Sequence, residues 1–122
     1  MTISEKLYTL FAPLCDGRVY FDGTPKDGPE GIPYIVIEMV PGQEVYYVER
    51  ELQNFSNHRV VVTGATKRPS TRDDLARQIT YAMCHSSFPA VVPYGSWMGG
   101  YSDVHDEYYS QQHFGVTHNE PA

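Results

Sequence analysis

The feature that most constrains the fold is the segment 34–40, in which apolar side chains occupy every position but one. In a strand, Ile35, Ile37 and Met39 would point to one face, and the opposite face would carry a single charge, that of Glu38. A strand that is apolar on both faces is typical of the interior of a sheet. We therefore expect a sheet with segment 34–40 at or near its centre.

Further strand patterns lie on both sides of this segment. Residues 17–21 and 59–66 are each expected to form a strand, and a last strand is expected over about 108–118. An aromatic and charged stretch after Pro41-Gly42 predicts a hairpin arm over 42–54. The glycines and prolines of 22–31 break both regular structures and predict a flexible loop.

Two segments have the spacing of amphipathic helices. Thr2 and Glu5 are placed to form a capping box at the start of the first helix, which Pro13 is expected to end. The second helix is expected to start within 69–74, where hydroxyls would cap it and acids would favour its dipole. Both helices carry an apolar stripe: Ile3, Leu7, Leu10 and Phe11 in the first, and Leu75, Ile79, Ala82, Met83 and Ser86 in the second.

These elements predict an α+β fold with a mainly antiparallel or mixed sheet of four to five strands and two main helices packed on one face. A length of 122 residues is that of a single domain, which we expect to span 1–122 and to fray at 119–122. The segment 95–101, rich in glycine and aromatic residues, is expected to form a loop before the last strand.

Composition excludes several classes of protein. The apolar content of 41% is too high for a disordered chain, and no apolar run reaches the about 18–20 residues that cross a membrane. The sequence begins without the basic and apolar regions of a secretory leader, so the expected compartment is the cytoplasm. A net charge of -6 with scattered basic residues argues against tight binding to the phosphates of nucleic acid. Cys15 and Cys84 lack a metal-type spacing and are expected to be free thiols.

No residue is assigned to catalysis, to a cofactor or to a metal. The segment 60–66 resembles the strand and first turn of short-chain dehydrogenases, but residues 67–70 replace the glycines that let a backbone approach a pyrophosphate. The histidines and acids of 103–118 fit no zinc spacing. Ser96 does not lie in a nucleophile elbow, and Cys84 and His85 point about 100° apart on a helix.

Tyrosine and tryptophan are frequent in the segments expected to form loops and arms. Such side chains are enriched at protein interfaces, because their rings bury large areas while keeping a polar contact. We therefore expect the protein to act by touching other proteins. The residues assigned to the interface are Tyr46, Tyr47, Glu49, Arg50, Glu51, Trp97 and Tyr101.

The order of the predicted elements resembles the small tail-completion proteins of long-tailed bacteriophages, the group that includes tail terminators. The resemblance covers about residues 5–118. It is carried by residues 7–14, by Gly17-Arg18-Val19-Tyr20, by 33–37, by 59–62 with 74–79, and by Tyr108-Tyr109 leading into 113–116.

This resemblance implies a structural protein of the virion, assembled in the host cytoplasm, that forms a homo-oligomeric ring, commonly a hexamer, at the head-proximal end of the tail tube. The ring would terminate tube polymerisation and form the tail side of the head-tail junction. Its partners would be the tail tube protein and a neck or head-closure protein, and DNA would pass through the lumen without sequence-specific binding. Two alternatives stay open: a neck or head-closure connector, and a small nucleotide-binding enzyme that uses the turn at 63–70.

Overall fold

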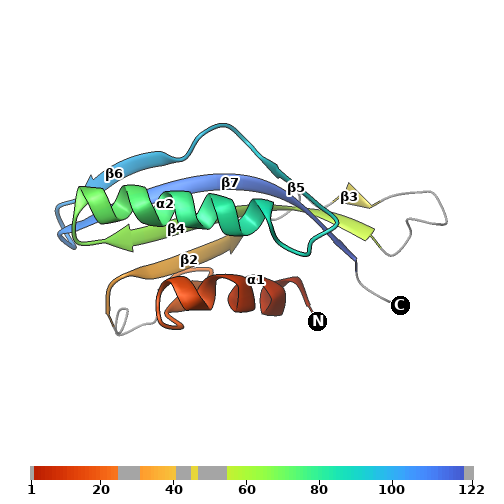
Figure 1. Ribbon diagram of the computed structural model, residues 1–122, viewed down its shortest axis with the longest axis horizontal. Coiled ribbons are helices and arrows are strands. Elements are labelled where there is room, and N and C mark those ends of the chain that lie inside the picture. Colours follow the sequence, from red (N-terminus) through yellow and green to blue (C-terminus); the bar gives the residue numbers. More distant parts are fainter. Residues whose placement is uncertain (1, 25–30, 41–44, 47–54, 120–122) are drawn as a thin grey trace.

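The chain folds around one mixed β-sheet, shown in Figure 1. This computed structural model describes residues 2–24, 31–40, 45–46 and 55–119. The elements follow one another as α1 (Ile3–Phe11), the 3-10 helix η1 (Ala12–Leu14), β1 (Val19–Phe21), β2 (Tyr34–Met39), β3 (Val45–Tyr46), β4 (Phe55–Thr66), α2 (Pro69–Cys84), β5 (Ala90–Pro93), β6 (Met98–Ser102) and β7 (Glu107–Asn119).

The sheet has the order β1-β2-β4-β7-β5, with β3 added to β4 and β6 added to β7. Only the β1–β2 pair is parallel, and the other described pairs are antiparallel. The long strands β4 and β7 form its spine, pairing from Phe55 opposite Asn119 to Thr66 opposite Tyr108. The predicted α+β class and mixed sheet are therefore confirmed, with β2 inside the sheet, between β1 and β4.

The number of strands is higher than predicted. The described residues form six strands of three residues or more, together with the two-residue strand β3, whereas four to five were expected. Part of the difference is β6, which takes in residues 98–101 of the predicted 95–101 loop, while residues 95–97 lie outside any strand. Gly99 and Gly100 fit into a strand here because aromatic rings occupy the space where their side chains would be. A Cβ on Gly99 would lie 2.9 Å from the Trp97 ring, and one on Gly100 would overlap the Tyr109 ring.

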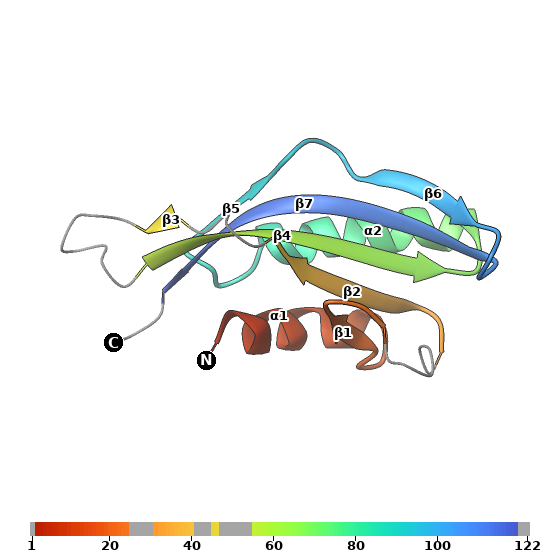
Figure 2. The same ribbon diagram turned by 180° about the vertical axis from the view of Figure 1, so that it is seen from behind.

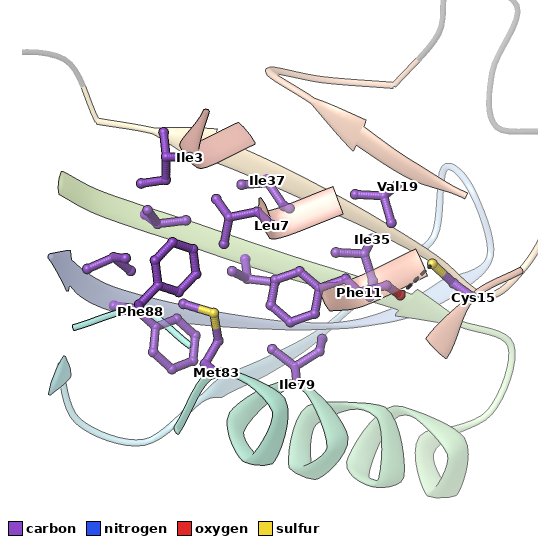
Figure 3. Packing of buried hydrophobic residues seen from close by; sticks show 14 of the residues in the cluster. Ile3, Leu7, Phe11, Cys15, Val19, Ile35, Ile37, Ile79, Met83 and Phe88 are labelled. Atoms are coloured by element: carbon purple, nitrogen blue, oxygen red, sulfur yellow. Dashed lines mark hydrogen bonds between the residues drawn. The ribbon is translucent and has the colours of Figure 1, made fainter. Parts of the chain in front are cut away.

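Both helices cover the same face of the sheet, as the two opposite views show (Figures 1 and 2). Their apolar stripes meet the inward side chains of the strands in one core, part of which is drawn in Figure 3. The buried members of this core are Ile3, Leu7, Phe11, Cys15, Val19, Ile35, Ile37, Val60, Val62, Leu75, Ile79, Met83, Phe88, Phe114 and Val116. The alternation along 34–40 thus sends Ile35 and Ile37 toward the helices, as their spacing predicted.

The two helices start in different ways. The capping box of α1 is confirmed, because the Glu5 amide donates to the Thr2 hydroxyl over 3.2 Å and the Thr2 amide donates to the Glu5 carboxylate over 3.4 Å. The predicted cap of α2 is wrong. The Thr71 hydroxyl donates to the Arg68 carbonyl over 2.9 Å instead of accepting from an amide, and the first turn contains no acid. Pro69 opens this helix, and its fixed φ suits that position.

Three predicted segments lie partly outside the described residues. Of the 42–54 arm, the structure describes only Val45 and Tyr46, which pair with Asn57 and Ser56 of β4. Of the 22–31 loop it describes residues 22–24 and 31, and of the 119–122 terminus only Asn119, the last residue of β7. Within the described residues, the structure shows no helix of sufficient length and hydrophobicity to cross a membrane.

Candidate protein-interaction surface

The face of the sheet opposite the helices, here called the open face, is not covered by any described helix (Figure 2). Strand register and alternation place one set of side chains on it: Tyr20, Tyr34, Val36, Glu38, Arg59, Val61, Thr63, Ala65, Val92, Met98, Glu107, Tyr109, Gln111, His113 and Thr117. The set mixes aromatic, aliphatic, polar and charged groups. Four of its members are buried, namely Tyr34, Val36, Val61 and Ala65. Three of these, Tyr34, Val36 and Ala65, pack with Tyr20 and Ile32 in a small second cluster, so the exposed part of the face lies elsewhere on it.

Tyr34 links two strands across the open face at one end of the sheet. Its hydroxyl donates to the Glu107 carboxylate over 2.6 Å, and its ring lies 6.2 Å from that of Tyr20. Burial raises the pKa of the Tyr34 phenol, and the bond to Glu107 raises it further. The phenol therefore stays protonated and remains a donor, so this contact fixes β2 relative to β7 on either side of β4.

At the other end of the open face, an arginine lies on an exposed aromatic ring. The Arg59 guanidinium lies 4.9 Å from the centre of the Tyr94 ring. That ring lies over Gly115, where a Cβ would come within 2.8 Å of the Tyr94 hydroxyl. Tyr94 is nevertheless 52% exposed. Arginine and tyrosine are the residue types that most often carry binding energy at interfaces.

Several large apolar side chains are exposed on or beside the open face. The side chain of Val92 is 54% exposed, that of Met98 is 62% exposed and that of Tyr109 is 38% exposed. The Tyr109 ring lies over Gly100. Scattered single residues of this kind are normal, but a set on one sheet face forms a surface. Aromatic residues, methionine and arginine are enriched in interfaces, which makes the open face a candidate contact surface.

Two of the residues assigned to the interface from sequence lie together in the structure, on the helix side of the sheet. Arg72 of α2 places its guanidinium 5.5 Å from the Trp97 ring and 5.8 Å from the Tyr108 ring. The Tyr101 ring lies 4.8 Å from that of Tyr108, and its hydroxyl donates to Asp106 over 2.5 Å. That hydrogen bond raises the pKa of the Tyr101 phenol. We call Arg72, Trp97, Tyr101 and Tyr108 the Arg72 cluster.

The other assigned interface residues belong to the arm. Tyr46 is the second residue of β3 and pairs with Ser56 of β4. The others, Tyr47, Glu49, Arg50 and Glu51, lie outside the described residues. Their assignment stays a prediction.

The glycine of the turn at 63–70, Gly64, is required by the packing of α2 on the sheet. A Cβ on Gly64 would lie 2.8 Å from Leu75 and 3.1 Å from Ile79, so this glycine lets α2 approach the sheet. The Thr66 hydroxyl is engaged with the Arg68 carbonyl over 3.0 Å. A pocket of about 470 Å³ does lie beside this turn, with Leu14, Ile32, Pro33 and Leu75 as its apolar lining and Lys67, Arg68, Thr66, Thr71, Asp74 and Gln78 as its polar lining.

The cysteines and histidines show no shared geometry that fits covalent chemistry. Cys15 is buried, its thiol donates to the Arg18 carbonyl over 3.3 Å, and burial raises its pKa. Cys84 is exposed, and the neighbouring His85 ring stacks on Tyr81 at 4.0 Å. In the part of the chain that the structure describes, no group of three or more His, Cys, Asp or Glu side chains is placed to hold a metal ion.

Known family models and curated proteins provide no relative whose interface could be compared with this surface. The chain matches no protein-family model, and a search of the curated proteins finds no match.

Sequence reasoning missed the open face as a surface. The signal was present in the last strand, where Tyr109, Gln111 and His113 alternate with Ser110 and Gln112. Both sets contain polar residues, so the pattern did not reveal which one faces the helices. The pairing of β7 with β4 settles this, because it aligns Phe114 with Val60 in the core.

Proposed function

We propose that this protein is a structural subunit of an assembly, and that it forms a ring at the head-proximal end of a phage tail tube, where it terminates the tube and joins it to the neck. The observation that carries the proposal is the one-sided cover of the sheet. Helices bury one face, while the other presents Val92, Met98, Tyr109 and the Arg59–Tyr94 pair.

The open face supports binding to protein rather than to a small molecule. It is the broad face of a sheet, and its polar and apolar groups are interspersed, as at interfaces between folded proteins. A ligand site usually encloses a small molecule in a concave pocket with converging polar groups. On this face the Tyr34 hydroxyl donates to the Glu107 carboxylate, so these two polar groups satisfy each other.

The assignment to a tail rests on the resemblance in element order. The helix, short strand, inner strand, spine strand, second helix and final strand follow one another along the chain in the order that carries the resemblance. The net charge also supports it. Six copies at -6 each carry -36 (6 × -6), and acids facing a lumen would discourage DNA from adhering as it passes.

A neck or head-closure connector is the second candidate, since it would use the same kind of surfaces with different partners. A small nucleotide-binding enzyme is less well supported. The pocket beside the 63–70 turn has cationic residues at its rim, but no described glycine lies where a backbone would approach a pyrophosphate. Calorimetric titration with NAD and ATP separates this class, because saturable heat is expected only of the enzyme.

The proposal is tested by deleting the gene for this chain from the genome that carries it and imaging the particles by electron microscopy. Overlong tubes without heads are the expected result. Normal-length tails beside unattached filled heads would transfer the protein to the neck, and normal virions would refute an assembly role.

A further inference from the structure

Strand β6 forms an edge of the sheet without the usual protection. Among the described strands it pairs with β7 alone, so its other side presents backbone amides and carbonyls that can accept another strand. Natural edges are blocked by proline, by charged side chains, by bulges or by very short length. The sequence Met98-Gly99-Gly100-Tyr101-Ser102 contains no proline and no charged residue.

The other described edges are protected. Strand β1 is three residues long, and β3 is two residues long. Strand β5 ends in Pro93, which has no amide hydrogen to donate, and Pro89 precedes it. Strand β6 is therefore the longest edge in the described sheet that lacks such a feature.

We propose that β6 pairs in antiparallel fashion with β6 of a second copy of the chain, with Gly100 facing Gly100 across a two-fold axis. In this register Met98 lies opposite Ser102 of the second copy, and Gly99 lies opposite its Tyr101. The pairing joins the two sheets into one continuous sheet.

The charges around β6 select the antiparallel direction. Asp103 and Asp106 follow the strand in the turn to β7. A parallel arrangement would bring the two acidic turns side by side, which is unfavourable. The antiparallel arrangement separates the two acidic turns and brings Asp103 of the second copy beside Trp97. The Arg72 guanidinium lies over the Trp97 ring, and the Arg72 Nε donates to Asp73.

The side chains on the strand also fit this register. Met98 is 62% exposed and Tyr101 is 47% exposed, so pairing would cover apolar surface that is otherwise in water. Gly99 is bounded by Trp97 and Arg72 on the helix side. Tyr101 of the second copy would lie next to this glycine on the same side of the sheet, beside the Trp97 ring, and would extend the Arg72 cluster across the contact.

This inference does not depend on the proposed function. A two-fold contact is distinct from the head-to-tail contact that closes a ring, and it can join two free copies or two rings.

Thiol cross-linking tests the register directly. Met98→Cys and Ser102→Cys are made separately on a Cys84→Ser chain, so that the exposed native thiol does not react, and are checked for folding by circular dichroism. In a dimer of either variant alone, the two thiols, one from each copy, would lie four residues apart along the strand direction. That separation is about 13 Å, which exceeds the reach of a short bifunctional reagent. Mixing the variants places unlike thiols directly opposite.

The expected result is a covalent dimer of about 28 kDa (2 × 13.8 kDa) from the mixture and almost none from either variant alone. A mixture of Ser102→Cys with Tyr81→Cys, on the exposed surface of α2, is the control for random collisions. Equal yields in all samples, or no dimer from the 98 and 102 mixture, would overturn the inference. If the chain forms a ring while the 98 and 102 mixture gives no dimer, the inference is overturned and the proposed function is left intact.

Discussion

Gly64 of β4 gives the sharpest test of how α2 packs on the sheet. In Gly64→Ala, the added methyl group would lie 2.8 Å from Leu75 Cδ2, 3.2 Å from Leu75 Cγ and 3.1 Å from Ile79 Cδ1. Both neighbours are almost fully buried, Leu75 at 4% and Ile79 at 2% exposure. They therefore have little space in which to move, and the helix or the side chains must shift.

The magnitude follows from two opposed effects. Forcing an extra methyl group into a well-packed core costs about 1–3 kcal/mol. Replacing glycine by alanine at a position with ordinary φ returns about 0.4–1 kcal/mol, because the unfolded chain loses freedom. We expect Gly64→Ala to lower the free energy of unfolding by about 1–2 kcal/mol, and Tm by about 4 °C per kcal/mol for a chain of this length.

Urea denaturation followed by circular dichroism measures this change. The matched control is Gly31→Ala, where the nearest atom to the new Cβ is Arg18 Nε at an ordinary 3.5 Å, so stability should stay unchanged or rise slightly. Leu75→Ala should cost less in the Gly64→Ala chain than alone, with a coupling of about 1 kcal/mol, because the new methyl fills part of the cavity. A Gly64→Ala protein as stable as the original would refute the packing explanation.

Three further predictions concern other contacts. Because the pKa of the Tyr34 phenol is raised, the folded chain keeps a proton that the unfolded chain releases near pH 10. The free energy of unfolding should therefore fall as pH rises above 10. Tyr34→Phe should reduce that fall, as measured by urea denaturation at several pH values. Arg72→Ala should shift the fluorescence of the single tryptophan, Trp97, whereas Arg68→Ala at an exposed position just before the same helix should leave the spectrum unchanged; equal spectra in both variants would contradict the Arg72 cluster. Leu7→Ala should destabilise the protein by about 3 kcal/mol, because this side chain is fully buried in the core, and a loss under 1 kcal/mol in urea denaturation would contradict that packing.

The main elements of the fold could be predicted because their patterns were strong. The apolar run of β2 and the capping box of α1 are local signals, and both segments form the expected structure. Strand β6 could not be recognised, since glycine disfavours strands in isolation. The rings of Trp97 and Tyr109 occupy the space where side chains at its two glycines would lie, and the positions of these rings depend on the pairing of β6 with β7.

The candidate surface was less predictable than the fold. Aromatic residues indicated an interface, but their distribution between the two faces of the sheet depends on register. Tyr109 lies on the open face, whereas its neighbour Tyr108 joins Arg72 on the helix side. A shift of one residue in the register of β7 would exchange these two roles. Sequence could therefore suggest contact with proteins but not the face that we propose for it.

Complementation tests whether the open face makes the contacts that assembly needs. Particles lacking the gene would be supplied with the original chain, with a Val92→Glu, Tyr109→Glu variant of the open face, or with Tyr81→Glu on the exposed surface of α2 as the control. All three positions are exposed, but the Tyr109 ring also packs over Gly100, so circular dichroism first checks that each variant folds like the original chain. Tail length and head attachment are scored by electron microscopy. We expect the original chain and the control to restore normal virions, whereas the open-face variant leaves overlong, headless tubes. Full rescue by the open-face variant would contradict it.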